Sequence, residues 1–337
     1  MRDSASPTSI YDLGPGIRWD ERKIAAFDRR GMLLAGLGLS ATGTMARALA
    51  AGTVAIIDQA SPKLSALEAH TGGRLGLWAG SFDDIPPVVW RPDEPFLMCS
   101  TFKALAVAAV LARVDRGEER LDRWIAYGKA DLLDHAPVTT DHVAQGGMAL
   151  GDLCAAAIEV SDNTAGNLIL ASYGGPAGLT QYLRGLGDTV TRLDRTEPAL
   201  NLPNPPGDLR YTTTPASMAG LWCRIVVGDA LSPASRGQLN LWLAACQTGA
   251  GRLPAAKPRG WTIGHKTGTG STTIGDVAVL RPPKGQPILI AAYLDGATCP
   301  AEQKDAAIAD AGRLALSALI SERRAVRSFS DPTSHAQ

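Results

Sequence analysis

Two side chains that can act as nucleophile and base stand three residues apart at the start of a long apolar segment. They are Ser100 and Lys103, in the run Cys99-Ser100-Thr101-Phe102-Lys103. This spacing places both on one face of a helix. The amino end of a helix favours a developing negative charge, and a lysine in apolar surroundings needs polar partners or a depressed pKa. The pattern therefore predicts a serine nucleophile with a lysine beside it.

Three more polar motifs follow this pair along the chain. They are Ser161-Asp162-Asn163 after an apolar helical segment, Glu197 with Asn201 in a proline-rich stretch, and Lys266-Thr267-Gly268 at the end of a predicted strand. Each alone has an ordinary structural interpretation, as a helix cap, a solvated turn or the approach to a hairpin. A carboxylate four residues before an amide can also hold and activate a water molecule. In this order, the motifs together indicate an active site assembled from several segments.

The elements that must position these residues follow the order strands, helices, strands. Strands are predicted over 74–79, 87–90, 261–267, 273–281 and 287–294. Helices are predicted over 100–116, 151–158, 164–173, 176–186 and 301–321, with Pro215 and Pro233 starting two more. Residues 139–149 are predicted as a loop, and 189–214, with four prolines, as a long functional loop. This order favours an α+β fold in which a helical insertion splits one antiparallel sheet, with the active site where the two parts meet.

Composition places the chain among ordinary globular proteins. It has 337 residues, 45% hydrophobic and 20% charged, with 33 basic against 33 acidic side chains. The balanced charge gives no reason to expect a nucleic acid partner. The five cysteines form no metal-ligand cluster, so neither a metal nor a cofactor is expected, and His135, His142 and His265 are predicted as loop or strand residues. Cys223 and Cys246 could pair, although buried free thiols are the simpler interpretation.

The amino-terminal segment resembles a twin-arginine export signal. Arg29 and Arg30 precede a weakly apolar stretch, and Ala48-Leu49-Ala50 supplies small residues for cleavage. We therefore expect a signal peptide over 1–50, a catalytic chain over 51–325 that is periplasmic or secreted, and a polar, disordered tail over 326–337. The alternative is a cytosolic helix with a chance arginine pair. The apolar stretch is well short of the ~20 residues of a membrane span, so no stable membrane insertion is expected after cleavage.

The four motifs in this order resemble the signature set of class A serine β-lactamases, S-x-x-K, S-D-N, E-x-x-L-N and K-T-G. The resemblance covers residues 60–322. It implies a five-stranded antiparallel sheet flanked by helices, with an all-helical part over 96–249 and an α/β part over 51–95 and 250–325. It also implies a monomeric enzyme without metal or cofactor. Such an enzyme would hydrolyse the β-lactam amide bond of penicillin- and cephalosporin-type antibiotics and so confer antibiotic resistance.

The resemblance also implies a role for each motif residue. Ser100 would form the acyl-enzyme, and its backbone N–H and that of Thr269 would form the oxyanion hole. Lys103 and Glu197 both remain candidates for the acylation base. Ser161 would carry a proton to the lactam nitrogen, and Asn163 would bind Lys103 and the substrate amide. Glu197 and Asn201 would hold the water that releases the acyl group.

A carboxylate site is implied for Lys266, Thr267 and Arg252, the last by its distance from Lys266 in a subgroup of the family. The alternative for Arg252 is a solvated side chain. Gly268 would leave the strand open to a flat substrate.

The chain departs from the family pattern at the long loop and at its cysteines. Tyr211 stands where an aspartate usually pairs with an arginine, here Arg195, and Asp208 is our candidate to replace that aspartate. The usual disulfide partners of Cys99 and Cys154 are here Gly270 and Val107, so neither family disulfide can form. Cys99 is therefore expected as a free thiol lining the pocket.

Two other functions share part of the pattern. A D,D-peptidase-like penicillin-binding enzyme carries the serine and lysine motifs without the deacylating glutamate, and a non-hydrolysing β-lactam sensor keeps only the fold. Glu197 and Asn201 argue against both alternatives. The sequence leaves open which penicillins, cephalosporins or carbapenems would be preferred.

Overall fold

The computed structural model describes residues 60–82 and 85–330 of the chain. The predicted signal peptide over 1–50 and the end of the predicted tail, over 331–337, lie outside these residues. No helix among the described residues is both long and apolar enough to cross a membrane.

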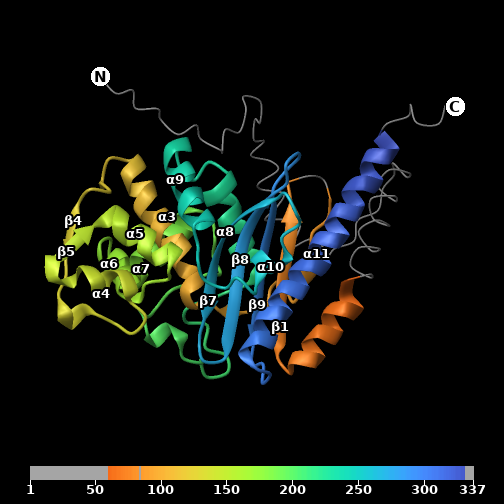
Figure 1. The fold of residues 1–337 in the computed structure, drawn as a ribbon, viewed down its shortest axis with the longest axis horizontal. Helices are drawn as coiled ribbons and strands as arrows, with labels where there is room; N and C mark the ends of the chain where they lie inside the picture. Colours follow the sequence, from red (N-terminus) through yellow and green to blue (C-terminus); the bar gives the residue numbers. More distant parts are fainter. Residues whose placement is uncertain (1–59, 83–84, 331–337) are drawn as a thin grey trace. The chain divides into compact units, whose positions relative to one another are not determined.

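A five-stranded antiparallel sheet in the order β2-β1-β9-β8-β7 forms the centre of the fold (Figure 1). Its strands are β1 (Arg74–Ser81), β2 (Val88–Trp90), β7 (Thr262–Thr269), β8 (Thr273–Arg281) and β9 (Ile288–Asp295). β1 pairs with β9 from Arg74 opposite Asp295 to Ser81 opposite Ile288. The early strands therefore join the late ones in one sheet, which confirms the predicted α+β fold.

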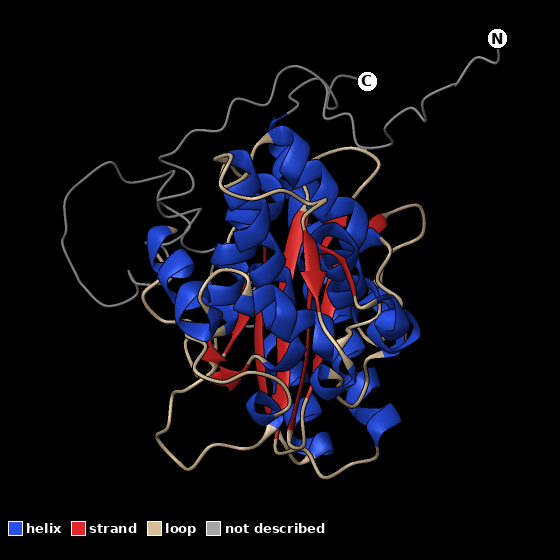
Figure 2. Ribbon diagram, turned by 90° about the vertical axis from the view of Figure 1, so that its left-hand side faces the viewer, coloured by secondary structure: helices blue, strands red, loops and turns tan. Residues whose placement is uncertain are grey.

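Helices cover both faces of this sheet (Figures 1 and 2). A helix over 60–71 and α11 (Ala301–Ser330) lie on one face, while α8 (Pro215–Trp222) and α9 (Pro233–Ala244) lie on the other. Leu64, Leu75, Ile290 and Leu319 are among the side chains fully buried between the sheet and α11. Burial of each such side chain contributes about 1.5–3 kcal/mol.

The carboxyl-terminal helix is longer than the sequence predicted. α11 continues to Ser330, so the predicted disordered tail is wrong for residues 326–330. Charged helix-forming residues carry no apolar period, but they continue a helix once it has begun. Arg323 anchors this last part by donating a hydrogen bond to the backbone oxygen of Gln286 at 2.9 Å.

The helical part surrounds α3 (Phe102–Asp115), which is buried from Phe102 to Ala112 as its apolar sequence predicted. Around it pack α5 (Leu150–Glu159), α6 (Asn163–Ala171), α7 (Gly175–Gly185) and α9. Two shorter α-helices among the described residues are α4 (Pro137–His142) and α10 (Leu253–Ala256). The described residues also form 3₁₀ turns over Cys99–Thr101, Lys129–Asp131, Val143–Gln145 and Ala199–Asn201. A π-helical turn covers Cys223–Val227.

Two short ladders show that the insertion is not all-helical. β3 (Phe96–Leu97) pairs with β6 (Thr212–Thr213), and β4 (Trp124–Ala126) pairs with β5 (Gly147–Ala149). The expectation of a plain loop over 139–149 is wrong, because the end of α4 and all of β5 lie there. Strands of two or three residues are too short to show a period in sequence.

Candidate active site

The predicted nucleophile lies where the sheet meets the buried helix. Ser100 is in the 3₁₀ turn over Cys99–Thr101 that leads directly into α3. Its Oγ donates a hydrogen bond to Glu197 Oε1 at 2.9 Å, and the residue is 7% exposed. Cys99 has φ 45°, in the left-handed region that is costly for a residue with a side chain. The surrounding packing holds the turn in this conformation, which is common at functional sites.

Lys103 is fully buried and has the polar partners that its sequence setting predicted. Its Nζ donates to the Ser161 carbonyl at 2.8 Å and to Asn163 Oδ1 at 2.7 Å. It also lies 3.3 Å from Glu197 Oε1, the oxygen that accepts from Ser100. Burial lowers the pKa of Lys103 below its ordinary value, although the Glu197 carboxylate opposes this shift. Ser100 and Lys103 therefore both contact the same carboxylate oxygen, Glu197 Oε1.

Ser161-Asp162-Asn163 links α5 to α6 and serves both the fold and the site. Asp162 caps α6 by accepting from the Ala165 N–H at 2.8 Å, so the helix-cap interpretation holds for this residue. Ser161 has φ 61°, and its Oγ accepts from Lys266 Nζ at 3.0 Å and from Lys103 Nζ at 3.4 Å. One hydroxyl thus bridges the two lysines.

Glu197 is held at both its backbone and its carboxylate. The Glu197 N–H donates to Asn167 Oδ1 at 2.9 Å, and Asn167 Nδ2 donates to the Glu197 carbonyl at 2.9 Å. Asn201 Nδ2 donates to Glu197 Oε2 at 2.5 Å. Sequence reasoning missed Asn167, although its position four residues after Asn163 on one helix face was an available signal.

The long loop closes through an aromatic contact in place of an ion pair. The Arg195 guanidinium lies 4.9 Å from the centre of the Tyr211 ring, and its Nη1 donates to the Tyr211 hydroxyl at 2.9 Å. The expectation that Asp208 replaces the family's aspartate is wrong, because its carboxylate forms an ion pair with Arg210. Tyr211 is fully buried and is itself the partner of Arg195 in the position of the family's aspartate.

β7 brings the fourth motif, Lys266-Thr267-Gly268, to the same place. Lys266 is fully buried and donates to Ser161 Oγ at 3.0 Å and to the Thr267 carbonyl at 2.9 Å. Burial is the main cause that lowers the pKa of Lys266 to about 7. A Cβ at Gly268 would lie 2.6 Å from the Met98 carbonyl oxygen, so only glycine lets β7 approach the turn this closely. The exposed Thr269 follows.

Arg252 lies behind β7 and is 6% exposed, so the solvated alternative is wrong. Its Nε donates to Asp305 Oδ1 at 2.7 Å, and Nη1 donates to the carbonyls of Gly268 and Gly275 at 2.9 and 3.0 Å. Its Nη2 donates to Thr269 Oγ1 at 2.8 Å. The guanidinium therefore fixes the backbone of β7 and β8 and, through Nη2, the hydroxyl of the exposed Thr269.

All five cysteines are free thiols, so Cys223 and Cys246 do not pair. Cys99 is free as expected but 1% exposed, and burial raises its pKa above the ordinary value. A Cβ at Gly270 would lie 2.8 Å from its Sγ. Cys99 therefore lies beneath the Gly270 backbone and does not line an open surface.

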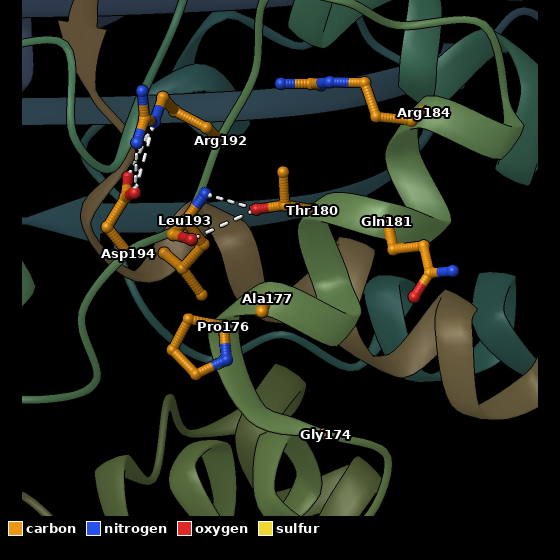
Figure 3. A pocket seen from close by; sticks show the side chains of 9 residues that line it. All are labelled: Gly174, Pro176, Ala177, Thr180, Gln181, Arg184, Arg192, Leu193 and Asp194. Carbon is orange, nitrogen blue, oxygen red and sulfur yellow. Dashed lines mark hydrogen bonds and ion pairs between the residues drawn. The ribbon is translucent and has the colours of Figure 1, made fainter.

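A separate pocket of about 640 Å³ lies between α7 and the start of the long loop (Figure 3). Its lining includes Thr180, Arg184, Arg192 and Asp194, and none of the motif residues. Thr180 Oγ1 accepts from the Leu193 N–H at 3.0 Å and donates to the Leu193 carbonyl at 3.1 Å. The described residues include no group of three or more His, Cys, Asp or Glu side chains that could hold a metal ion.

The arrangement of these side chains defines a serine acyl-transferring hydrolase. One serine donates to a carboxylate oxygen that a lysine also contacts, and a second serine bridges two lysines. Comparison with known proteins gives the family. Residues 59–319 match the model of the beta-lactamase enzyme family.

Curated relatives agree with the family match. The chain is 43% identical to beta-lactamase AST-1 of Nocardia asteroides, over 87% of this chain and 96% of that protein. It is 41% identical to beta-lactamase CTX-M-25 of Escherichia coli, over 75% of this chain and 86% of that protein.

Solved structures agree as well. The class A beta-lactamase of the last common ancestor of Gram-negative bacteria is 53% identical, with a TM-score of 0.75 over 77% of this chain and 98% of that one. A putative class A beta-lactamase from Rhodopseudomonas palustris is 49% identical, with a TM-score of 0.74 over 78% of this chain and 99% of that one. The chain belongs to the beta-lactamase enzyme family, as a class A serine β-lactamase.

Proposed function

We propose that this chain hydrolyses the amide bond of β-lactam antibiotics through an acyl-enzyme on Ser100, released by water that Glu197 activates. The observation that carries the proposal is the position of the Glu197 carboxylate. One oxygen lies 2.9 Å from Ser100 Oγ, and the other accepts from Asn201. A carboxylate so close to the nucleophile can act on the serine proton and later on a water beside the acyl group.

Acylation begins with loss of the Ser100 hydroxyl proton. Glu197 Oε1 already accepts this proton's hydrogen bond, and Lys103 Nζ lies 3.3 Å from that oxygen. Because burial lowers the pKa of Lys103, its neutral form is easier to reach than in water. Either group can therefore accept the proton as Ser100 Oγ attacks the lactam carbonyl. The backbone N–H groups of Ser100 and Thr269 are our candidates for stabilising the resulting oxyanion.

Breaking the lactam C–N bond requires a proton on the departing nitrogen. Ser161 Oγ can supply it, because that hydroxyl accepts hydrogen bonds from Lys266 and Lys103 and can be reprotonated by either. Lys266, Thr267 and Thr269 would bind the substrate carboxylate, with Arg252 fixing Thr269. Asn163 orients Lys103 and is placed to bind the substrate amide.

Deacylation needs a water molecule between Glu197 and the acyl carbon. Asn201 Oδ1 is buried without a hydrogen-bond partner among the described residues, which leaves an acceptor beside Glu197 that can orient such a water. Glu197 takes one proton as the water oxygen attacks the acyl carbon; the ester bond to Ser100 then breaks, and the proton passes from Glu197 to the departing Ser100 Oγ, 2.9 Å away. Asn167 holds the backbone of Glu197 and so fixes the position of its carboxylate.

Turnover of a chromogenic cephalosporin by the purified chain tests this proposal. We expect many turnovers per enzyme molecule, with Glu197→Ala instead accumulating a covalent adduct on Ser100 that mass spectrometry detects. Removal of a catalytic general base typically costs 10²–10⁴-fold in rate. A single stoichiometric burst in the unaltered chain would indicate a penicillin-binding enzyme, and no adduct at all a sensor. Steady-state turnover that is unchanged in Glu197→Ala would contradict the role given to this residue.

We also propose that the enzyme is exported folded by the twin-arginine route and acts as a monomer. The Arg29-Arg30 pair and the Ala48-Leu49-Ala50 run support export. We expect the double substitution Arg29→Lys with Arg30→Lys to retain the chain in the cytoplasm, as measured by cell fractionation and activity. Export of this variant at the original level would contradict export by the twin-arginine route. Sedimentation of the purified chain tests the monomer.

A further inference from the structure

A cysteine, a histidine and an aspartate lie together behind Lys266, outside all four motifs. Cys246 follows the end of α9, His265 precedes Lys266 in β7, and Asp276 lies in β8. β7 and β8 pair with Thr267 opposite Asp276, so the side chains of His265 and Asp276 share one face of the sheet. His265 Nδ1 lies 3.0 and 3.2 Å from the two Asp276 carboxylate oxygens.

The His265–Asp276 pair places a positive charge inside the protein. Asp276 is fully buried and also accepts from the Leu253 N–H at 3.1 Å. Burial opposes a charge on His265, but the charge and hydrogen bond of Asp276 outweigh it and raise the pKa of His265 to about 10. His265 is therefore an imidazolium at neutral pH. The chain after α9 runs beside this strand: a Cβ at Gly264 would lie 3.1 Å from Leu243 Cβ, and Thr248 Oγ1 lies 2.6 Å from Thr267 Oγ1, so Cys246 lies beside His265.

Cys246 is partly exposed and has cations and a hydroxyl around its sulfur. Burial disfavours its thiolate, but His265, the charge of Lys266 and a hydrogen bond from Thr248 lower the pKa of Cys246 to about 7. The buried thiols Cys99 and Cys154 show the opposite shift, because burial raises their pKa. Besides Asp276, the acidic residue Glu159 at the end of α5 is next to this segment, because its backbone carbonyl accepts from the Gln247 N–H at 2.8 Å.

We propose that Cys246 is a reactive thiol that undergoes exchange with small disulfides, and that the mixed disulfide weakens substrate binding at Lys266 and Thr267. In this step the Cys246 sulfur attacks one sulfur of the disulfide, and a new S–S bond forms as the old one breaks. The other half leaves as a thiolate with the bonding electron pair. Cys246 is oxidised to the disulfide level, and the leaving half is reduced.

Two contacts connect this thiol to the substrate site. Cys246 Sγ lies 3.4 Å from Thr248 Oγ1, which lies 2.6 Å from Thr267 Oγ1. The negative charge of the Cys246 thiolate also favours the protonated form of Lys266. A neutral mixed disulfide removes that charge and adds bulk beside Thr248. The consequence for turnover rests on the proposed hydrolysis, whereas the reactivity of the thiol does not.

The test treats the full chain with hydroxyethyl disulfide, a small neutral reagent, and measures adducts at each cysteine by peptide mass spectrometry. Cys299 is the internal reference, because it is also partly exposed. At pH 7 we expect Cys246 to react about 3- to 4-fold faster than Cys299, because lowering a thiol pKa to about 7 increases the ionised fraction more than it decreases the nucleophilicity of the thiolate. The rate at Cys246 should reach half its maximum near pH 7.

The same samples report on the substrate site. We expect the adduct to raise KM for the chromogenic cephalosporin several-fold with a smaller change in kcat, and dithiothreitol to reverse the effect. The Cys246→Ser variant should form no adduct at this position, and its KM should no longer respond to the reagent. His265→Gln, checked for folding by thermal unfolding, should slow labelling of Cys246 several-fold.

Equal labelling of Cys246 and Cys299 would contradict the proposal that Cys246 is a reactive thiol. A labelling rate at Cys246 that reaches half its maximum only near pH 8.5 would contradict it as well. This measurement needs no variant and no β-lactam, so its failure is distinct from a failure of the proposed hydrolysis. A complete adduct at Cys246 with KM unchanged would overturn the link to the substrate site.

Discussion

Glu197 and Lys266 are buried ionisable side chains, and each depends on neighbours from another segment. Glu197 depends on Asn167 and Asn201, and Lys266 on Ser161. The buried amines have no water to stabilise their charge, so the protein supplies hydrogen-bond acceptors in its place. The charge state of each residue is therefore set by the assembled site.

The pH dependence of kcat/KM should follow the protonation of Lys266. Because its pKa is lowered to about 7, Lys266 loses its positive charge as pH rises through 7 in the free enzyme. Its attraction for the substrate carboxylate then falls, so we expect kcat/KM to decrease above about pH 7. Steady-state kinetics across pH measure this effect.

Lys266→Arg is the matched control, because arginine stays charged throughout this range. The decrease near pH 7 should be absent from its profile, even if its overall rate is lower. An identical decrease in both proteins would assign the titration to another group, such as Lys103 or Cys246.

The sequence predicted the residues of the site better than their supports. Ser100, Lys103, Ser161, Glu197 and Lys266 could be named because their types and spacing are those the chemistry needs. Asn167 had only its place four residues after Asn163 as a signal, and Thr248, a hydroxyl that contacts another hydroxyl, has no distinctive spacing. Arg252 was expected at the substrate, but in the fold its guanidinium is occupied by the strand and Asp305.

At the scale of elements, the long loop from 189 to 214 depends on a buried aromatic ring. Tyr211 stacks with Arg195, and its hydroxyl contacts Leu202 and Asn204 across the loop. Its backbone N–H donates to Asp194 at 3.0 Å. A sequence pattern alone suggested a missing ion pair and pointed to Asp208. It could not show that a neutral side chain at Tyr211 would serve, because that requires the loop to fold around the ring.

Two substitutions separate the ring from its hydroxyl. Tyr211→Phe keeps the stacking and loses the hydrogen bonds, so we expect the free energy of unfolding to fall by about 1–2 kcal/mol. Tyr211→Ala also removes a fully buried ring and should cost about 3–5 kcal/mol. Urea unfolding measures both.

A looser loop should also slow deacylation, because Glu197 lies on it. The acyl-enzyme should therefore accumulate more in Tyr211→Ala than in Tyr211→Phe. Equal stability losses in the two variants would show that the ring contributes nothing beyond its hydroxyl.

For the whole molecule, Arg252 joins the last helix to the strand that carries the fourth motif, Lys266-Thr267-Gly268. Its guanidinium binds Asp305 on α11, the carbonyls of Gly268 and Gly275 in β7 and β8, and Thr269. Elements that do not touch the substrate thereby determine where Thr269 stands. The fold order predicted from sequence is correct, but this cross-link depends on tertiary distances that no local pattern encodes.

Replacing this arginine tests the cross-link. Arg252→Lys keeps one charge but cannot reach both carbonyls and Asp305 together, so we expect a loss of about 2–3 kcal/mol in stability. We also expect a several-fold rise in KM. Asp305→Asn is the control, because it changes only the contact to α11. If both variants lower stability equally and leave KM unchanged, the contacts to β7 and β8 have no effect on the site.

The pairing of β1 with β9 has a consequence for how the enzyme acquires activity. Residues 74–81 meet residues 288–295 across more than half of the chain, and β8 and β7 follow outward from that junction. Contacts so distant in sequence form late and slowly in refolding. Lys266 and Ser161, which lie 105 residues apart in the chain, also meet through such a distant contact. Recovery of antibiotic turnover after dilution from denaturant should therefore lag behind the return of the helical circular dichroism signal. The rate of that recovery would measure the final step of folding.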